Sequence, residues 1–411
     1  MKRRDFLGVA ASPLAAATRG VKRQVFLPSP AKGTAVMAYA FYTEATGGGM
    51  ISVEQRLSRS DTIDISYYRK SADNGRTWSH PIAVPTGGKR PNGMWRKHPR
   101  AGYVDPRTGR LLQFWVEGVL PSDDPLEGMK QWNVYYRVGE NGEARQVIAE
   151  GKEFGPRHPF PAVYTGRNSM MLGDVSCIPV TARDGTILLP LEITPLGPNG
   201  EYYNPGGGYT YSDSALALGR WEGGRLVWRA SERIIADPRK STRGMVEPTV
   251  EFLDDGRLLV VMRGSNDKKP ELPSYRWVAY SSDGGRTFTK PAPWTYANGE
   301  PFFSPSSCSQ LLKHSSGRLF WLGNITPENP RGNRPRYPFV IGEVDRRAGL
   351  IEKKTVRTID NRQPGESDLL TLSNFFAHED RETKEIVLYM TRLFAFTSGW
   401  EGDAMIYRIE A

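Results

Sequence analysis

One eight-residue pattern occurs twice in this chain, far apart along the sequence. The segments SADNGRTW (71–78) and SSDGGRTF (281–288) both read Ser-x-Asp-x-Gly-x-Thr-aromatic. In each, the aspartate can accept backbone N–H groups across a tight turn, the glycine can take a positive φ angle, and the threonine and aromatic residue begin the next strand. Each copy follows a strand-like run, Ile63–Tyr68 or Trp277–Tyr280. Two such hairpins predict a repeated β-sheet architecture.

The eight-residue pattern resembles the Asp-box of the sialidase superfamily, whose copies lie on the blades of a six-bladed β-propeller. The resemblance implies an all-β fold of that kind, with the Asp-boxes on outer turns that stabilise the blades and take no part in catalysis. An apolar strand, a tight turn and a second apolar strand also recur along the chain at blade-like spacing. The recurring units are Ala35–Trp78, Ala101–Val138, Gly173–Ser212, Glu247–Phe288, Ser307–Val344 and Leu370–Ile409. We therefore expect one six-bladed β-propeller domain over residues 21–411.

Composition narrows the classes of partner. The 43 glycines and 31 prolines among 411 residues indicate many turns and few long helices. The net charge of +10 lacks the concentrated basic runs of a nucleic-acid binder and suits an anionic glycan. We expect a glycan or oligosaccharide substrate, no nucleic acid, no cofactor and a monomer. The histidines are scattered singly, so we expect no metal site, and Cys177 and Cys308 are predicted to be buried free thiols.

The first twenty residues, MKRRDFLGVAASPLAAATRG, have the features of an export signal: basic residues, a weak apolar stretch and then small residues. The run from Arg3 to Leu7 resembles a twin-arginine signal, a type that exports folded proteins. The apolar stretch is too short to span a membrane. We therefore expect a signal peptide at 1–20 and a periplasmic or secreted protein without a membrane span.

The segment VEQRLSRSD (53–61) carries the first specific catalytic resemblance. Sialidases have a similar Glu-x-Arg-x4-Asp segment in the first blade, and the resemblance implies that Asp61 is the general acid/base. Glu54 and Arg56 would support it, with Arg56 binding substrate. An aspartate at a strand edge facing a central pocket can exchange a proton with a leaving oxygen. Asp64 is an alternative to Asp61.

Two further segments resemble sialidase sites. GMVEPTVEFL (244–253) precedes an Asp-Gly-Arg turn and a strand that ends at Arg263, and the resemblance implies that Glu247 activates the nucleophile while Arg263 binds the substrate carboxylate. A guanidinium fork suits bidentate carboxylate binding. In the segment 324–337, Arg336 best fits another substrate-binding arginine, with Arg334 as the alternative.

The chain departs from the sialidase pattern at two positions. Sialidases hold an arginine in the first strand, whereas this region offers only Lys32. Where sialidases place a tyrosine nucleophile, QPGESDL (363–369) has Glu366. A neutral tyrosine suits a substrate with a carboxylate on its anomeric carbon, so a carboxylate nucleophile favours a different sugar. Glu366 and Asp61 would then form a catalytic pair; if a tyrosine acts instead, Tyr337 is the nearest candidate.

These motifs predict an exported glycoside hydrolase of the sialidase superfamily that removes a terminal, acidic sugar from glycans. Two alternatives remain: an inactive glycan-binding propeller, and a glycosidase or lyase acting on a uronic or deoxy sugar. The presence of both Asp61 and Glu247 favours an enzyme. We expect the predicted site residues to converge at the axial opening: Asp61, Glu247, Glu366, Arg263 and Arg336.

Overall fold

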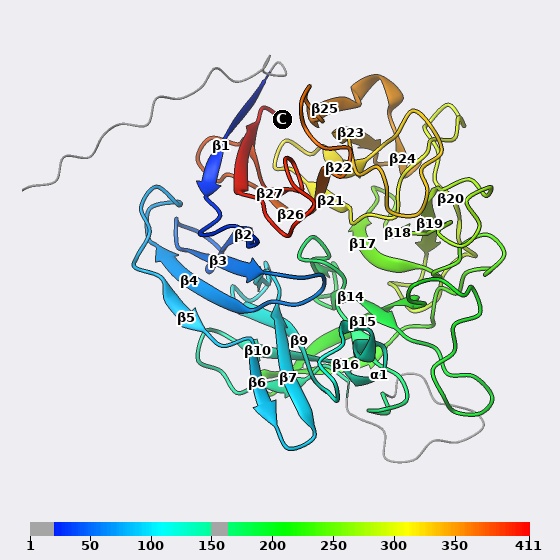
Figure 1. The fold of residues 1–411 in the computed structure, drawn as a ribbon, viewed down its shortest axis with the longest axis horizontal. Helices are drawn as coiled ribbons and strands as arrows, with labels where there is room; N and C mark the ends of the chain where they lie inside the picture. Colours follow the sequence, from blue (N-terminus) through cyan, green and yellow to red (C-terminus); the bar gives the residue numbers. More distant parts are fainter. Residues whose placement is uncertain (1–19, 149–162) are drawn as a thin grey trace, which may run out of the picture.

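The computed structural model of the chain describes residues 20–148 and 163–411. Their strands form six antiparallel sheets, which Figure 1 shows as blades around a common centre. The predicted all-β, six-bladed β-propeller is therefore confirmed. The predicted signal peptide lies, apart from Gly20, outside the described residues.

Blades one to three are built from consecutive segments. The first blade contains β2 (Ala35–Tyr42), β3 (Met50–Leu57), β4 (Ile65–Ser71) and β5 (Ile82–Val84). The second contains β6 (Gly87–Arg90), β7 (Gly93–Pro99), β8 (Tyr103–Val104), β9 (Leu111–Leu120), β10 (Asn133–Val138) and β11 (Arg145–Gln146). The third contains β12 (Met170–Met171), β13 (Val180–Thr181), β14 (Ile187–Ile193), β15 (Asp213–Glu222) and β16 (Arg225–Ala230).

Blades four to six complete the ring. The fourth contains β17 (Val246–Phe252), β18 (Leu258–Arg263), β19 (Arg276–Ser281) and β20 (Ala292–Pro293). The fifth contains β21 (Gln310–Lys313), β22 (Leu319–Asn324), β23 (Phe339–Asp345), β24 (Leu350–Ile351) and β25 (Arg357–Asp360). The sixth contains β26 (Thr371–Glu379), β27 (Ile386–Leu393), β28 (Ala404–Ile409) and β1 (Val21–Leu27).

Helices are short in the described part of the chain. They are the 3-10 turns η1 (Pro125–Glu127) and η2 (Lys353–Thr355) and the single-turn helix α1 (Gly128–Gln131). None of them is long and apolar enough to cross a membrane.

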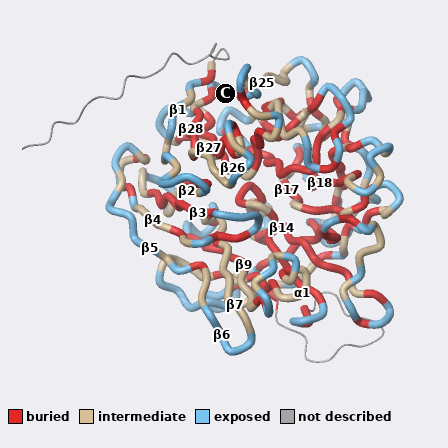
Figure 2. Tube along the Cα trace, in the orientation of Figure 1, coloured by how far each residue is buried: buried red, intermediate tan, exposed pale blue. Residues whose placement is uncertain are grey.

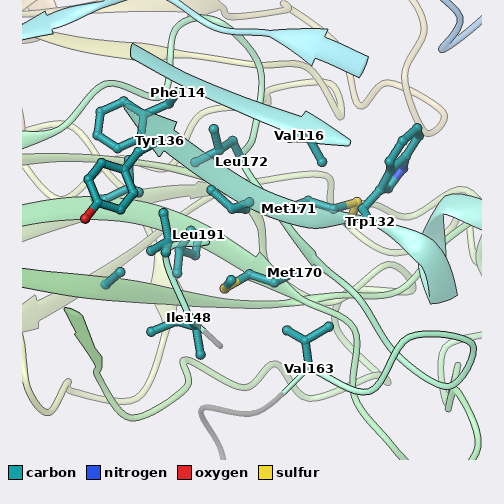
Figure 3. Close-up of a cluster of buried hydrophobic side chains, with 14 of the residues drawn as sticks. Phe114, Val116, Trp132, Tyr136, Ile148, Val163, Met170, Met171, Leu172 and Leu191 are labelled. Carbon is teal, nitrogen blue, oxygen red and sulfur yellow. The ribbon is translucent and has the colours of Figure 1, made fainter. Parts of the chain in front are cut away.

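The second strand of each blade lies in the core between neighbouring blades. Strands β14, β18, β22 and β27 are buried along their whole length, because both faces of each sheet pack against another blade. Figure 2 shows this buried interior, and Figure 3 shows one part of it, where Phe114 and Val116 of β9 meet Met170 and Leu191 of the third blade. This packing explains the continuous apolar runs in the sequence.

Both Asp-boxes form the predicted turn, between the third and fourth strands of their blades. Asp73 accepts the Thr77 N–H at 2.9 Å, and Asp283 accepts the Thr287 N–H at 3.0 Å. Hydrogen bonds from the Thr77 hydroxyl and backbone N–H lower the pKa of Asp73 to about 2. Gly75 has a φ of 77°, as the turn requires. The Asp-boxes therefore close outer hairpins, far along the blade from the inner strands.

The N-terminal strand closes the ring, a feature absent from our sequence-based expectation. β1 pairs with β28 from Val21 opposite Ile409 to Leu27 opposite Ala404, so the sixth blade contains both ends of the described chain. A buried charge cluster lies beside this seam. Asp360 accepts hydrogen bonds from Arg23 at 2.9 Å and from Arg392, and Tyr407 also donates to it.

We predict that Asp360→Asn strongly destabilises the fold, because it leaves Arg23 and Arg392 near the seam with less compensating charge. The expected loss is about 3–5 kcal/mol of unfolding free energy, measured by denaturant unfolding. The control is Asp255→Asn, which removes an exposed carboxylate paired with Arg257 in a turn and should cost at most about 1 kcal/mol. Equal stability of the two variants would contradict a closing role for Asp360.

Candidate active site

A cavity of about 710 Å³ opens at one end of the propeller axis. Every blade contributes to its lining, because the innermost strands approach one another there: β17 contacts β21, β21 contacts β26 and β26 contacts β2. The lining includes, from blades one to six in order, Gln55, Arg100, Asp174, Glu247, Arg336 and Asn374. The cavity is therefore the place where residues distant in sequence can act on one ligand.

Four of the predicted site residues line this cavity: Asp61, Glu247, Arg263 and Arg336. Arg334 also lines it, but Arg334 is exposed whereas Arg336 is partly buried. The alternative acid Asp64 is not part of the lining; its carboxylate accepts the Ser58 N–H at 2.8 Å within the same loop.

Arg56 lies outside the cavity lining. Side chains alternate between the two faces of β3, so that Gln55 and Leu57 line the cavity while Arg56 points away. The Arg56 guanidinium bonds Glu54 at 2.8 Å and covers the ring of Tyr67 at 4.5 Å. The expectation that Arg56 contacts substrate has no support in this geometry.

Glu366 also lies outside the cavity lining, which corrects the expected convergence. Its buried carboxylate pairs with Arg392 and accepts the Gln363 N–H at 2.8 Å. The loop thus turns the Glu366 carboxylate toward Arg392 of the seam cluster and away from the cavity lining. Tyr337, the tyrosine alternative, packs against the core of the fifth and sixth blades and is not part of the lining either.

Glu247 and Arg263 form an ion pair at the cavity wall. The Arg263 Nη1 lies 2.6 Å from Glu247 Oε1, and Arg263 Nε donates to the Ser306 hydroxyl at 2.8 Å. Glu247 lies at a bulge in the β17–β18 ladder, which re-aims its side chain. Burial tends to raise the pKa of Glu247, but the charge and hydrogen bond of Arg263 outweigh it, so the pKa lies below its usual value.

Two further arginines give the cavity an excess of positive charge. Arg336 Nη2 donates to the Ser306 carbonyl at 3.0 Å, while its buried Nε has no partner. Arg243, which the sequence analysis missed, donates to the Thr210 hydroxyl. Burial and the charge of Arg263 lower the pKa of Arg336 to about 10. Within the described residues, neither Arg243 nor Arg336 has an ion-paired carboxylate, so an anionic ligand would complete the cluster.

A side chamber of about 190 Å³ adjoins the main cavity and shares Asp61, Arg243 and Glu247 with it. Its apolar wall consists of Val116, Pro125, Leu126, Met129, Trp132, Met171 and Leu172. His98 lies at the junction, with Nε2 buried and unpartnered. Burial lowers the pKa of His98 to about 3, so its imidazole is neutral at physiological pH. One wall of the chamber is therefore apolar, and the rest of its lining is polar or charged.

Left-handed backbone is concentrated around the cavity. Asp61, Glu247, Asn374 and Phe394 have φ angles of 51°, 49°, 56° and 63°, and all four line it. Such conformations are uncommon for non-glycine residues and gather at functional sites. Asp61 is exposed at the rim, where the Ser60 hydroxyl donates to it at 2.8 Å. The fold thus accepts backbone strain to aim these side chains at one space.

Comparison with known proteins assigns the chain to a family. A family model described as the BNR repeat-like domain matches residues 126–368, more than half of the sequence. The chain belongs to the BNR repeat-like family. This match and the sialidase-like propeller confirm the resemblance that the Asp-boxes suggested. No curated protein matches this member of the family.

Several solved structures resemble this BNR repeat-like protein. The NanB sialidase from Streptococcus pneumoniae has a TM-score of 0.58 at 12% identity, covering 94% of this chain and 70% of that one. An α-L-arabinanase from Penicillium chrysogenum has a TM-score of 0.56 at 11% identity, covering 94% and 97%. A Dyadobacter fermentans protein of unknown function has 0.57 at 14%, covering 96% and 100%. The chain spans 66% of the Hadza microbial sialidase Hz136 and 59% of a Trypanosoma rangeli sialidase. These likenesses show a fold shared with glycoside hydrolases.

We predict that Glu192→Gln stabilises the protein at high pH. Glu192 is buried in β14 and accepts the Glu247 N–H at 2.9 Å. Burial, and then the charge of Glu247, raise its pKa above the ordinary 4.5. Above that ordinary value the unfolded chain loses the Glu192 proton first, so rising pH favours unfolding until the native carboxyl also ionises.

Glutamine keeps the accepting oxygen but has no charge, so the variant avoids this cost. Its free energy of unfolding, measured by denaturant titration, should match that of the wild type near pH 4 and exceed it increasingly toward pH 8, by roughly 1–3 kcal/mol. A constant difference between the two proteins across this pH range would refute the raised pKa.

Proposed function

We propose that this protein is a glycoside hydrolase that removes a terminal, acidic sugar from glycans. The observation that carries the proposal is the arginine cluster: Arg243, Arg263 and Arg336 line one cavity, and among the described residues Arg263 alone of the three has an ion-paired carboxylate, Glu247. A sugar carboxylate would accept hydrogen bonds from guanidinium groups already held in position by Thr210 and Ser306. Arginine suits this task because its planar fork matches a carboxylate.

The shape of the site supports release of a terminal sugar. The cavity volume is in the range of small-molecule sites, which suits a single terminal sugar. Asp61 lies exposed at the rim, where a leaving glycosidic oxygen would emerge. In this proposal Asp61 donates a proton to that oxygen as general acid. The side chamber takes a substituent of the same sugar.

We predict that Arg336→Ala weakens binding of carboxylated sugars by about 10- to 150-fold, the range for hydrogen bonds to charged groups. Calorimetry with N-acetylneuraminic acid, glucuronic acid and glucose measures this, and glucose should bind weakly to both proteins. The matched control is Arg229→Ala, an exposed arginine of the outer strand β16. Equal affinity of the wild type for glucuronic acid and glucose would contradict an anionic site.

The enzymatic part of the proposal has its own test. Aryl sialosides, uronides and rhamnosides are offered to the wild type and to Asp61→Asn, which should lower turnover by about 10²–10⁴-fold. Binding of acidic sugars without hydrolysis of any glycoside would instead identify a glycan-binding propeller.

We further propose that the protein is exported through a twin-arginine signal at 1–20. Replacing Arg3 and Arg4 by lysine should retain the precursor in the cytoplasm, because that route depends on the arginine pair. Cell fractionation and immunoblotting measure the distribution. Unchanged export of the double variant would indicate the general secretory route.

A further inference from the structure

The carboxylates of the cavity and its side chamber differ in their ion pairs and in which of the two spaces they line. Glu247 is ion-paired with Arg263. The buried Glu192 carboxyl accepts a hydrogen bond from the backbone N–H of Glu247. Asp267 accepts the Tyr209 N–H at 3.2 Å and the Thr242 hydroxyl, which engages both of its oxygens within one loop cluster. Glu247 is thus paired with an arginine, Glu192 lines the side chamber alone, and Asp267 lines the main cavity alone.

Asp61 and Asp174 differ from those carboxylates. Both line the main cavity and also the side chamber, so they lie where the two spaces meet. Among the described residues, neither forms an ion pair. Asp61 is at the exposed rim, whereas Asp174 is partly buried, between the second and third blades' inner segments. Glycoside hydrolysis uses two carboxyl groups that flank the scissile bond, and Asp61 and Asp174 are two carboxyl groups that line the same space.

Neutral donors hold the Asp174 carboxylate without cancelling its charge. Its Oδ1 accepts the Val175 N–H at 2.8 Å, and its Oδ2 accepts the Asn374 side-chain amide at 2.9 Å. Asn374 belongs to β26 of the sixth blade, across the axis from the third blade. It therefore reaches Asp174 across the ring.

The position of Asn374 is itself unusual. Its φ of 56° is left-handed, and the β26–β27 register shifts between Ser373 and Phe375. Its backbone N–H donates to the buried free thiol of Cys308 at 3.2 Å. A bulge in an inner strand re-aims one side chain, and here the result is the bond to Asp174. The left-handed backbone at Asn374 thus directs its side-chain amide to a carboxylate that lines the cavity.

We propose that Asp174 is the nucleophile of this enzyme, oriented by Asn374 as a positioning residue, and that its substrates are glycosides of hexuronic acids. This inference rests on the proposed function. The structure leaves the nucleophile open otherwise, because Glu366 and Tyr337 lie outside the cavity lining. Among the described residues, Tyr209 is the one tyrosine that lines the cavity, and its side chain is half-exposed at the rim.

The reaction proceeds in two balanced steps. A carboxylate oxygen of Asp174 bonds to the anomeric carbon while the bond to the leaving oxygen breaks, and that oxygen takes the proton of Asp61. Water then gives a proton to Asp61 and bonds to the anomeric carbon, which releases the Asp174 carboxylate.

The substrate class follows from charge. An anionic nucleophile is repelled by a carboxylate attached to the carbon it attacks, as in sialosides. A hexuronic acid carries its carboxylate on the far side of the ring oxygen, where the arginine cluster can bind it. Burial and the charge of Glu247 raise the pKa of Asp174, against the effect of Arg100, so activity should fall on the acidic side as this group is protonated.

The decisive experiment labels the nucleophile in the wild-type protein. A 2-deoxy-2-fluoro-hexuronyl fluoride forms a glycosyl ester that is hydrolysed slowly, and peptide mass spectrometry then locates it. We expect the label on Asp174. A label on Tyr209 or Glu247, or uronide hydrolysis with inversion and without a label, would overturn the assignment.

Variants give an independent reading. Asp174→Ala should lose at least about 10³-fold in turnover on an aryl uronide, and azide should restore turnover while forming a glycosyl azide. Asp184→Asn, an exposed carboxylate paired with Arg220, is the control. Asn374→Ala should shift the acidic limb of the pH profile upward, because the carboxylate loses a donor to its charged form. An unshifted profile would overturn the positioning role.

The failure of this inference and the failure of the proposed function give different results. Hydrolysis of sialosides but no uronide would overturn Asp174 and the hexuronide class while retaining an acidic-sugar hydrolase. Hydrolysis of neither, together with unselective sugar binding in the calorimetry, would overturn both.

Discussion

The pairing of β1 with β28 is the constraint on which the rest of the structure depends. Inner strands of the fourth, fifth, sixth and first blades contact one another in turn, and the pairing of β1 with β28 closes the ring. The cavity has no single supporting element, since all six blades contribute to it. The first blade supplies Asp61 and the sixth supplies Asn374, and these two blades meet at the seam. Hydrogen bonds on the outer edge of one sheet therefore fix the distance between groups at the axis.

Charged clusters at the seam and at the cavity show two uses of buried arginine. Arg392 at the seam has two carboxylate partners, Asp360 and Glu366, so its charge is compensated inside the protein. Arg243 and Arg336 have no such partners among the described residues. Uncompensated buried charge costs stability, and folds retain it where a ligand supplies the missing charge. The contrast separates a structural role for Glu366 from a binding role for the arginine cluster.

The sequence predicted those features that depend on local patterns. Apolar strand pairs and turn residues indicated the six blades, and short motifs at strand ends brought Glu247 and Arg263 into one cavity with Asp61. It did not predict the partner of β1, because a strand of seven residues does not show which distant edge it joins. Glu366 was placed by alignment of a loop, and the ion pair with Arg392 is visible only in three dimensions.

Arg243, Asp174 and Asn374 were missed for a different reason: none belongs to a motif. A signal did exist, because Arg100, Asp174, Glu247 and Asn374 each precede the second strand of their blade, β9, β14, β18 or β27, by a similar number of residues. Comparing the repeats by position within the blade, as well as by matching residue types, would have identified these four residues next to the axis. Because the blades repeat, each has an equivalent residue position beside the axis, and the residue at that position determines the chemistry of the site.

Ring closure also orders the folding of this chain in time. β1 precedes the other five blades in the chain and its partner β28 follows them, so the ribosome makes the two partners at different times. Until β28 emerges, the sixth sheet is incomplete and the apolar faces on either side of the gap remain open to solvent. Contacts of such long sequence separation form slowly, and exposed sheet edges invite association with other chains. The interval before β1 and β28 pair is thus the stage of biogenesis at which the chain is most exposed to chaperones and proteases.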